Sequence, residues 1–585
     1  MTESHGPTRF VIILVLLGLV MAVLVGRLAY LHIGGGDHVQ ATAAKTRTFK
    51  QTLTVPRGQI LEGSPSAGIL ALNEGVKDIW VDPSLLIASN RVGTTLTCLA
   101  PLIPIDLEDV LPRVNKTNSQ FAVIARYIPN EKAEAVAKLK LPGVHMSDSS
   151  IRFYPQNMML CHVIGFANNE GVGSSGIELA MEKLLKGSPG MIESRLDGHR
   201  REMVERRTQE IPSKSGADVV LTIDQNLQFM LEKGIDTAME RNRSKAAFAI
   251  IERVRTGEIL AMVSRPGFDP NKFREARDPE KLNRAIGYNY EPGSTFKVSV
   301  IAAALNEKIV TPDQIFNTEN GRWLYMGKVL RDYHSYSQLS VADILKKSSN
   351  IGAAKIAIML GDVRMDKYLR SFGIGSKLGL DLPGEETGIL ASVQKWSGIS
   401  SSRIAVGQGV AVTGLQMLGV ICAIANDGKL MKPYVVKEVI ADDGTVLLRR
   451  QPQLIATPIR PETAALMRRL LARVCEEGGT GIKARVPGFS VGGKTGTAQK
   501  PVAGHYSETD YMASFVGFLP VEKPEIGMIV VFDEPQPLHT GGAVSAPVFG
   551  EVAEQAVRYL ELTPTEPVVT VSNGKDRADT PGETF

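Results

Sequence analysis

An uncharged apolar segment near the amino terminus constrains what this chain can fold into more than any other feature. It runs from Phe10 to Gly26, 17 residues without a charged side chain, and a helix of that length measures about 25 Å. The hydrocarbon core of a bilayer is roughly 30 Å thick, and the apolar residues after Arg27 supply the missing length, because an arginine side chain can snorkel to the interface. We therefore predict a transmembrane helix over residues 10–33, preceded by a short segment, 1–9.

A cleavable signal peptide is the alternative for this segment. The apolar region of such a peptide usually has about 7–15 residues, and a cleavage site of small residues follows it closely. The best candidate site here, Ala41–Ala43, lies 15 residues beyond Gly26, which favours an uncleaved anchor. The positive-inside rule does not orient the anchor, because Arg9 on one side is opposed on the other by Arg27, Lys45, Arg47 and Lys50.

The composition narrows the functional classes. With 43% hydrophobic and 22% charged residues, the 585-residue chain has the make-up of about two to four globular domains. A net charge of +4 over this length gives no reason to expect nucleic acid as a partner. The sequence has no HExxH motif and no clustered histidines, so we expect neither a metal site nor a cofactor. Four cysteines without metal-like spacing are expected to be unpaired thiols: Cys98, Cys161, Cys422 and Cys475.

A polar connector, RRTQEIPSKSGAD, divides the part of the chain that follows the anchor. Residues 40–215 mix short strand-like runs with polar helical patches and form the first predicted domain. In residues 216–560, strand-like runs at both ends enclose helical patterns, which predicts a mixed sheet covered by helices. The strand-like runs include AAFAIIER and IGMIVVFDE, and the helical ones include VADILKKSSNIGAAKIAIML and APVFGEVAEQAVRYLEL. Residues 561–585 lack periodicity and are predicted to be a disordered tail.

The stretch YEPGSTFKVSV, residues 290–300, carries a serine and a lysine three residues apart, ahead of an apolar run. Pro292 and Gly293 suit a turn into a helix. Ser294 is therefore expected at the helix amino terminus, with Lys297 beside it on the same face. A lysine in an apolar wall can lose its proton and then deprotonate a serine, while backbone N–H groups at the helix end can hold an oxyanion. The alternative is a capped helix with an incidental lysine.

The Ser-x-x-Lys spacing is weak evidence by itself, because it recurs elsewhere. Ser392–Lys395 follows a Pro-Gly-Glu turn, and Ser572–Lys575 lies in the polar tail, where nothing desolvates a lysine. A second motif gives the first copy more weight. KKSSNIG places Ser348 and Asn350 two residues apart, where a hydroxyl can relay a proton and an amide can hold a substrate amide.

The third motif lies in FSVGGKTGTAQ, a strand-like stretch. Thr495 and Thr497 face the same way in a strand, and Gly496 between them lets another backbone come close. An extended peptide can add to such an edge, with its terminal carboxylate near the two hydroxyls and Lys494. A similar Lys-Ser-Gly at Lys214–Gly216 lies in the polar connector and lacks this strand setting.

The three motifs occur in the order Ser-x-x-Lys, Ser-x-Asn and Lys-Thr-Gly, which is the trio of penicillin-binding proteins and class A β-lactamases. The chain resembles a class B penicillin-binding protein, a monofunctional peptidoglycan transpeptidase anchored in the bacterial inner membrane. The resemblance covers most of residues 55–555. Its motifs outside the trio are PRGQI, RFYPQN, HVIGFANNEGVGSSGIE, LTIDQNLQ, TGEILAMVSRPGFDPN, NRAIGYNYEPGSTFK, GQGVAVTGLQ, AIANDG and ASFVGFLP.

The resemblance implies a fold and a location. After a single-pass anchor, residues 40–215 would form an elongated α+β pedestal of the dimerisation type. Residues 216–560 would form a serine transpeptidase domain, with a central antiparallel sheet covered by helices and an all-helical subdomain. Residues 1–9 would be cytoplasmic and the catalytic domain periplasmic. The implied partners are peptidoglycan stem peptides, β-lactam antibiotics, the membrane, a separate glycosyltransferase and other division proteins.

The resemblance also implies the role of each site residue. Ser294 would be the acyl acceptor that attacks the D-Ala-D-Ala bond, and Lys297 would be its base. The N–H groups of Ser294 and Thr497 would form the oxyanion hole. An amine from a neighbouring stem peptide would then resolve the acyl-enzyme into a cross-link. The other implied site residues are Ser348, Asn350, Lys494, Thr495 and Gly496.

Several alternatives remain open at this level. A D,D-carboxypeptidase or a β-lactamase would use the same residues with water as acceptor. A non-catalytic β-lactam sensor and a purely structural division scaffold belong to other functional classes. SSNIGAAK resembles the division-specific (septal) branch more than the elongation branch, which often has Asp at the position of Asn350, so we expect septal synthesis.

Two local features of residues 40–215 do not fit the resemblance directly: a dinucleotide-binding pattern and a missing family motif. GVGSSG at 171–176, with Asp197 downstream, fits a dinucleotide-binding fingerprint. Glu170 would lie close to the pyrophosphate there, and the resemblance gives these glycines a structural role instead. The usual Asp-Arg-Asn-Gly after the first pedestal motif is absent, with Glu62 and Gly63 where the acid and the arginine are expected, so the local fold there is left open.

Overall fold

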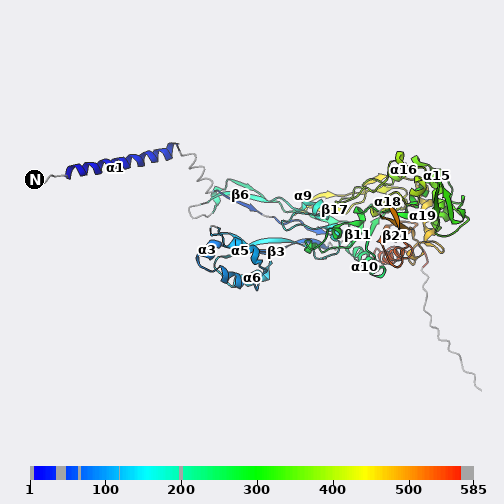
Figure 1. The fold of residues 1–585 in the computed structure, drawn as a ribbon, viewed down its shortest axis with the longest axis horizontal. Helices are drawn as coiled ribbons and strands as arrows, with labels where there is room; N and C mark the ends of the chain where they lie inside the picture. Colours follow the sequence, from blue (N-terminus) through cyan, green and yellow to red (C-terminus); the bar gives the residue numbers. More distant parts are fainter. Residues whose placement is uncertain are drawn as a thin grey trace, which may run out of the picture. The chain divides into compact units, whose positions relative to one another are not determined.

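The computed structural model describes residues 6–34, 48–53, 55–63, 68–117, 119–196, 202–502 and 504–567 (Figure 1). By their contacts, residues 1–56 and 187–216 form one compact unit, and residues 57–186 and 217–585 form another. Residues 1–5, the candidate cleavage site Ala41–Ala43, Asp197, the Ser572–Lys575 pair and the predicted tail from residue 568 onward lie outside the described residues.

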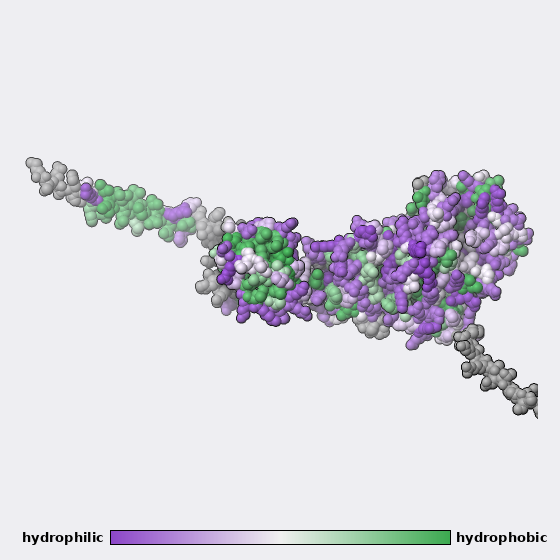
Figure 2. Space-filling view, turned by 60° about the horizontal axis from the view of Figure 1, so that its bottom comes forward, coloured by the Kyte–Doolittle hydropathy of each residue, from purple (hydrophilic) through white to green (hydrophobic). Residues whose placement is uncertain are grey.

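The first unit contains the apolar helix predicted near the amino terminus. Helix α1 (Gly6–Ala29) continues into a π-helical turn, η1 (Tyr30–Gly34). Its stretch Thr8–His32 is the one helix among the described residues that is long and apolar enough to cross a membrane, and Figure 2 shows its hydrophobic surface. The unit also holds an antiparallel sheet in which β6 (Gly190–Leu196) pairs with β1 (Thr48–Leu53), β7 (Glu202–Met203) and β8 (Gln209–Ile211).

A seven-stranded sheet begins the second unit. Its order is β18 (Val446–Arg449), β17 (Val436–Ile440), β9 (Asp218–Leu221), β2 (Ile60–Leu61), β3 (Ile69–Val81) and β4 (Ala122–Pro129), and β5 (Val144–Phe153) also pairs with β3. A small separate core of apolar side chains lies where β3 to β5 meet four helices. These are α3 (Pro83–Ala88), α4 (Val92–Leu99), α5 (Leu107–Val114) and α6 (Asn130–Lys138).

Glu62 explains the departure after the first pedestal motif. Its buried carboxylate accepts hydrogen bonds from the backbone N–H of Gly68 at 3.1 Å and of Gln225 at 3.0 Å. A Cβ on Gly63 would lie 2.2 Å from the carbonyl oxygen of Leu221, so only glycine fits there. In this chain a carboxylate and a close backbone contact fix the connection between β2 and β3.

Three short helices follow the early strands: α7 (Cys161–Ile164), α8 (Gly176–Ala180) and α9 (Glu182–Leu185). A buried ionic cluster ties α8 and α9 to β5. The carboxylate of Glu178 on α8 is fully buried and accepts from Nε of Arg57 and Nε of Arg152, each at 2.6 Å. Tyr154 donates to the same carboxylate at 3.3 Å. Arg57 also pairs with Glu182 on α9 at 2.6 Å, so two arginines and two carboxylates of opposite charge hold the cluster together.

The glycines of 171–176 serve this cluster. A Cβ on Gly173 would lie 1.9 Å from the carbonyl oxygen of Glu178, so the loop can wrap closely around α8 only without a side chain. The apolar run HVIGFA before these glycines begins in α7 (Cys161–Ile164), whereas a dinucleotide-binding fingerprint needs a strand there. A short apolar run reads the same in a strand and in a buried helix, and here it packs into the core as one helical turn.

Removing the shared carboxylate should destabilise the protein. Glu178→Ala leaves the buried guanidinium of Arg152 without its counter-charge and Arg57 with Glu182 alone, and breaking a buried ion pair from one side costs about 3–5 kcal/mol. Asp148→Ala is the matched control, because it removes an exposed partner of Lys77 and should cost about 1 kcal/mol or less. Urea unfolding of both variants measures the difference, and equal losses of stability would contradict the central place of Glu178 in the cluster.

A five-stranded sheet forms the main core of the second unit, and all its neighbouring strands are antiparallel. Its order is β11 (Ile259–Arg265), β10 (Ala246–Arg253), β22 (Ile526–Asp533), β21 (His505–Leu519) and β20 (Gly492–Val502). Side chains alternate between two covered faces. Strands buried on both faces have continuous apolar sequences, which is why AAFAIIER and IGMIVVFDE were recognisable as strands.

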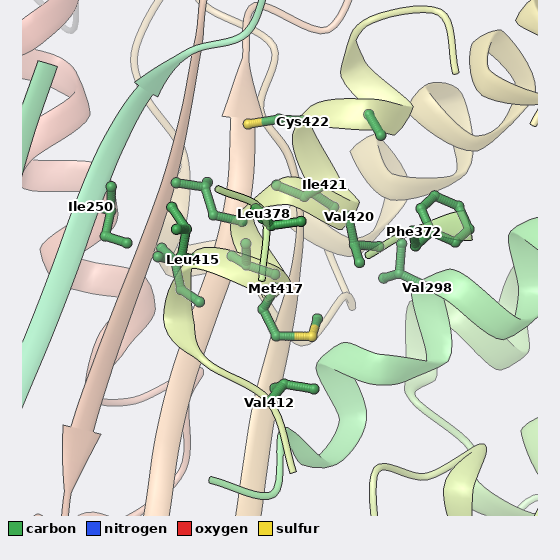
Figure 3. Close-up of a cluster of buried hydrophobic side chains, with 14 of the residues drawn as sticks. Ile250, Val298, Phe372, Leu378, Val412, Leu415, Met417, Val420, Ile421 and Cys422 are labelled. Atoms are coloured by element: carbon green, nitrogen blue, oxygen red, sulfur yellow. The ribbon is translucent and has the colours of Figure 1, made fainter. Parts of the chain in front are cut away.

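Helices cover both faces of this sheet. Helices α10 (Gln225–Asn242) and α20 (Ser545–Tyr559) contribute to the core on one face. On the other face lie α13 (Lys297–Asn306) and α18 (Gly414–Ala425), and Figure 3 shows the apolar side chains of α18 between β10 and α13. The predicted fold class, one apolar helix followed by a mixed α/β part with an antiparallel sheet covered by helices, is confirmed.

The helical region beside the sheet differs from expectation at one point. Residues 341–360 were expected to be continuous, but α14 (Val341–Lys347) and α15 (Asn350–Leu360) are separate helices. Ser348 adopts a left-handed conformation, with φ 62°, and ends α14, while the hydroxyl of Ser349 accepts from the N–H of Gly352 and begins α15. The break places a serine and an asparagine at a helix junction.

The remaining elements complete the second unit, apart from η2 in the first. The helices are α11 (Asp278–Lys281), α12 (Arg284–Gly287), α16 (Asp362–Ser371), α17 (Ser400–Ile404) and α19 (Pro461–Cys475). The strands are β12 (Ile315–Asn317), β13 (Arg322–Tyr325), β14 (Lys328–Arg331), β15 (Gln338–Ser340), β16 (Leu430–Met431) and β19 (Leu454–Ala456). The 3-10 turns are η2 (Val204–Arg206), η3 (Pro270–Lys272), η4 (Gly293–Phe296), η5 (Glu319–Gly321), η6 (Val393–Lys395) and η7 (Ile482–Ala484).

Candidate active site

Ser294 lies on a tight turn directly before a buried helix. The turn η4 leads into α13, and Gly293 has a φ of 57°, which favours glycine. The side chain of Lys297, at the start of α13, is fully buried, and its Nζ lies 2.9 Å from Oγ of Ser294. The serine therefore sits at the helix start with the lysine beside it, as the sequence predicted.

The burial of Lys297 changes its chemistry. Desolvation lowers its pKa well below the usual range, and the nearby positive charge of Lys494 lowers it further, while Asp332 opposes both effects. Its Nζ also donates to the carbonyl oxygen of Ser348 at 2.6 Å and to Oδ1 of Asn350 at 2.7 Å. A lysine with a lowered pKa that touches a hydroxyl can act as a base.

The junction between α14 and α15 supplies the second motif. The hydroxyl of Ser348 lies 3.2 Å from Nζ of Lys297 and 2.9 Å from Nζ of Lys494. Nδ2 of Asn350 donates to the carbonyl oxygen of Arg331 at 2.8 Å, which fixes the orientation of its amide. One hydroxyl therefore connects the two lysines.

Strand β20 supplies the third motif. Lys494 is fully buried, and desolvation lowers its pKa to about 7. Oγ1 of Thr495 donates to Oγ1 of Thr480 at 2.8 Å, and Oγ1 of Thr497 accepts from the N–H of Gly541 at 3.1 Å. A Cβ on Gly496 would lie 2.3 Å from Oγ of Ser514, so a larger residue would displace this segment of the strand.

The outer edge of β20 lies next to the serine turn. β20 is the last strand in the order of its sheet, and among the described strands it pairs with β21 alone. A Cβ on Gly293 would lie 3.1 Å from the carbonyl oxygen of Thr497, which places the turn against the strand. An extended peptide can add to an edge of this kind with its backbone near the hydroxyl.

The structure brings five of the predicted site residues into one hydrogen-bond network: Ser294, Lys297, Ser348, Asn350 and Lys494. Thr495, Gly496 and Thr497 lie on the adjoining strand. The other described Ser-x-x-Lys pair does not take part, because Ser392 and Lys395 are exposed on η6.

Asp332 is a residue of the site that sequence reasoning missed. Its carboxylate accepts from Oγ of Ser349 at 2.6 Å, from the N–H of Asn350 at 2.5 Å and from the N–H of Ile351 at 2.9 Å. It thereby caps the amino terminus of α15 and holds Asn350 in place. Because Asp332 lies 17 to 19 residues before these partners, no local capping pattern identifies it.

Two family models match the chain. The penicillin binding protein transpeptidase domain matches residues 247–554, and the penicillin-binding protein dimerisation domain matches residues 52–221. The first match covers more than half of the chain and contains all three motifs. The second covers most of the region for which a pedestal was expected.

Named relatives match nearly the whole chain. Stage V sporulation protein D of Bacillus subtilis is 33% identical over 96% of this chain and 88% of its own length. Peptidoglycan D,D-transpeptidase FtsI of Escherichia coli is 31% identical over 96% of this chain and 94% of its own. Penicillin binding protein 3 of Mycobacterium, solved with aztreonam, shares the fold at 24% identity, with a TM-score of 0.68 over 89% of this chain and 99% of that chain.

The dimerisation domain comes before the transpeptidase domain, which is the order expected from the sequence. Relatives of 33% and 31% identity extend over 96% of the chain. The chain belongs to the class B penicillin-binding proteins.

Proposed function

We propose that this protein is a peptidoglycan D,D-transpeptidase that cross-links stem peptides through an acyl-enzyme on Ser294. One observation carries the proposal: a fully buried lysine, Lys297, lies 2.9 Å from the hydroxyl of that serine. The activity named for the relatives from Escherichia coli and Neisseria supports it, as does the matched transpeptidase domain. β-Lactams acylate the same serine in this proposal.

Acylation begins with neutral Lys297, which has two N–H groups and one lone pair. The carbonyl oxygen of Ser348 and Oδ1 of Asn350 accept the two N–H groups, so the lone pair is left for the hydroxyl of Ser294. As Oγ attacks the carbonyl carbon of the penultimate D-alanine, its proton passes to Lys297. The peptide bond then breaks, and the terminal D-alanine leaves with a proton relayed through the hydroxyl of Ser348.

The other groups stabilise charge. In this proposal the N–H groups of Ser294 and Thr497 hold the oxyanion. Lys494, with the hydroxyls of Thr495 and Thr497, receives the terminal carboxylate of the substrate. In the second step an amine from another stem peptide attacks the ester carbonyl, Lys297 takes the amine proton, and Ser294 regains its proton as the cross-link forms.

The same proposal assigns the rest of the chain. Residues 10–33 anchor the protein in the bacterial inner membrane, with residues 1–9 cytoplasmic; the length and composition of the stretch Thr8–His32 support this. Residues 40–215 form the pedestal, and residues 216–560 form the periplasmic transpeptidase domain. The SSN motif supports septal over lateral-wall synthesis. A separate glycosyltransferase and other division proteins are the proposed partners, because cross-linking needs glycan strands.

Labelling with a fluorescent penicillin tests the nucleophile. Ser294→Ala should abolish covalent labelling, because Ser294 is the proposed nucleophile and the other hydroxyl near Lys297, that of Ser348, bridges to Lys494. Ser392→Ala, at the exposed copy of the same spacing, is the matched control and should be labelled like the wild type. Mass spectrometry of the labelled peptide should find the adduct on Ser294. A Ser294→Ala protein that is labelled normally would sink the proposal.

The two lysines predict the pH dependence of acylation. Lys297 is active when neutral, so the acylation rate should fall as the pH drops through its lowered pKa. Lys494 holds a carboxylate when charged, and its charge is lost as the pH rises through about 7, so acylation efficiency should fall again on the alkaline side. Lys494→Arg should move the alkaline limb upward, because a guanidinium stays protonated. An alkaline limb that stays in place would exclude Lys494 as its origin.

Asp332 should matter through the position of Asn350. Asp332→Ala removes the acceptor for two backbone N–H groups at the start of α15, and acylation by penicillin should slow about tenfold, or about 1.4 kcal/mol. Asp332→Asn keeps an acceptor oxygen and should restore part of the rate, while the exposed Asp313→Ala serves as control. Stopped-flow acylation with thermal unfolding in parallel measures the effect. If Asp332→Asn is as slow as Asp332→Ala while both variants keep full stability, the lost acceptor oxygen is not the cause. That outcome would contradict a positioning role.

A further inference from the structure

A cavity lies beside the site, and none of the steps proposed above uses it. It has a volume of about 440 Å³. Three segments line it: residues 288–291 just before the serine turn, residues 409–411, and residues 499–501 at the far end of β20. Ile389 and Met512 add apolar surface. The cavity is therefore continuous in sequence with both the nucleophile turn and the substrate-binding strand.

Three residues that line this cavity carry oxygen atoms without partners. Among the residues that the structure describes, Oδ1 of Asn289, the hydroxyl of Tyr290 and Oε2 of Glu291 are buried and have no hydrogen-bond partner. The Tyr290 side chain is deeply buried, with the residue 4% exposed. Buried polar atoms are normally paired, so this run of unpaired oxygens beside the cavity marks a place where hydrogen-bond donors are missing.

Glu291 is held with one oxygen engaged and the other unused. Its Oε1 accepts from the N–H of Gly409 at 2.8 Å and from the hydroxyl of Tyr506 at 3.2 Å, and burial raises its pKa. The one lysine that lines the cavity, Lys500, is already paired at 2.6 Å with both Asp533 and Glu534. The cavity thus presents acceptors and an uncompensated carboxylate, which suit a cationic donor.

The direction of β20 says which part of a substrate reaches the cavity. A peptide that adds antiparallel to β20, with its terminal carboxylate near Lys494 and Thr495, runs toward residues 499–501 in its upstream part. Strands advance about 3.4 Å per residue, so the residue before the acylated D-alanine lies within reach of the cavity. Its side chain, if long, can enter between that end of β20 and Glu291.

We propose that this cavity binds the side-chain ammonium of the diamino acid that precedes the D-alanine pair in the donor stem peptide, with Glu291 as its counter-charge. The inference rests on the proposed function. Cross-linking needs an amine on a stem peptide, and the donor strand carries that amine as well. Protonated and held at Glu291, the donor's own amine cannot attack the neighbouring ester, so the acceptor strand alone resolves the acyl-enzyme.

Two depsipeptide donors test the assignment on the full-length protein in detergent. One ends in lysyl-D-alanyl-D-lactate, and the other has norleucine in place of lysine, which removes the ammonium and keeps the aliphatic chain. Release of D-lactate gives kcat/KM for each donor, and the readout is their ratio within one variant. The wild type should prefer the lysine donor at least tenfold. In Glu291→Gln the preference should fall below about twofold.

The control is Glu386→Gln, which changes an exposed carboxyl group that does not line the cavity and should keep the wild-type preference. Equal rates with both donors in the wild type, or a preference that survives in Glu291→Gln, would overturn the inference. Penicillin labelling of Ser294 separates this failure from that of the proposed function. A protein that is labelled on Ser294 and turns over both donors alike retains the function and loses the assignment of the cavity.

Discussion

The site depends on the burial of two lysines within one hydrogen-bond network. Lys297 and Lys494 are fully buried, and the hydroxyl of Ser348 lies within 3.2 Å of both Nζ atoms. Burial disfavours the charged form of both amines, and the charge of Lys494 disfavours it further at Lys297, so Lys297 suits the base and Lys494 the cation. One is free to act as a base while the other keeps a charge for the substrate carboxylate. The scaffold maintains this difference by bringing α13 and β20 together from distant parts of the sequence.

Much of this could be predicted from the sequence because the signals are local. The apolar helix, the buried strands and each of the three motifs are readable from a few consecutive residues. The fold class followed from the apolar runs at both ends of residues 216–560. The site followed because Ser294, Lys297 and the later motifs carry side chains whose chemistry fits only one kind of reaction when combined.

What could not be predicted depends on contacts across the chain. The break between α14 and α15 requires Ser348 in a left-handed conformation, a choice that packing imposes and propensity does not reveal. Asp332 caps a helix from a preceding loop, and Glu178 pairs with arginines 121 and 26 residues away. The same distance hides the cavity at Glu291, whose walls come from three separate segments.

The unpaired edge of β20 has a consequence for self-association. An unpaired strand edge is a template for any extended chain, and proteins usually block such edges with proline or charge. Here the edge from Lys494 to Thr497 carries no proline, and Pro501 comes only beyond the motif. Lys494, Thr495 and Gly496 are nevertheless buried, so burial, and not proline, keeps extended chains of other copies away from this edge.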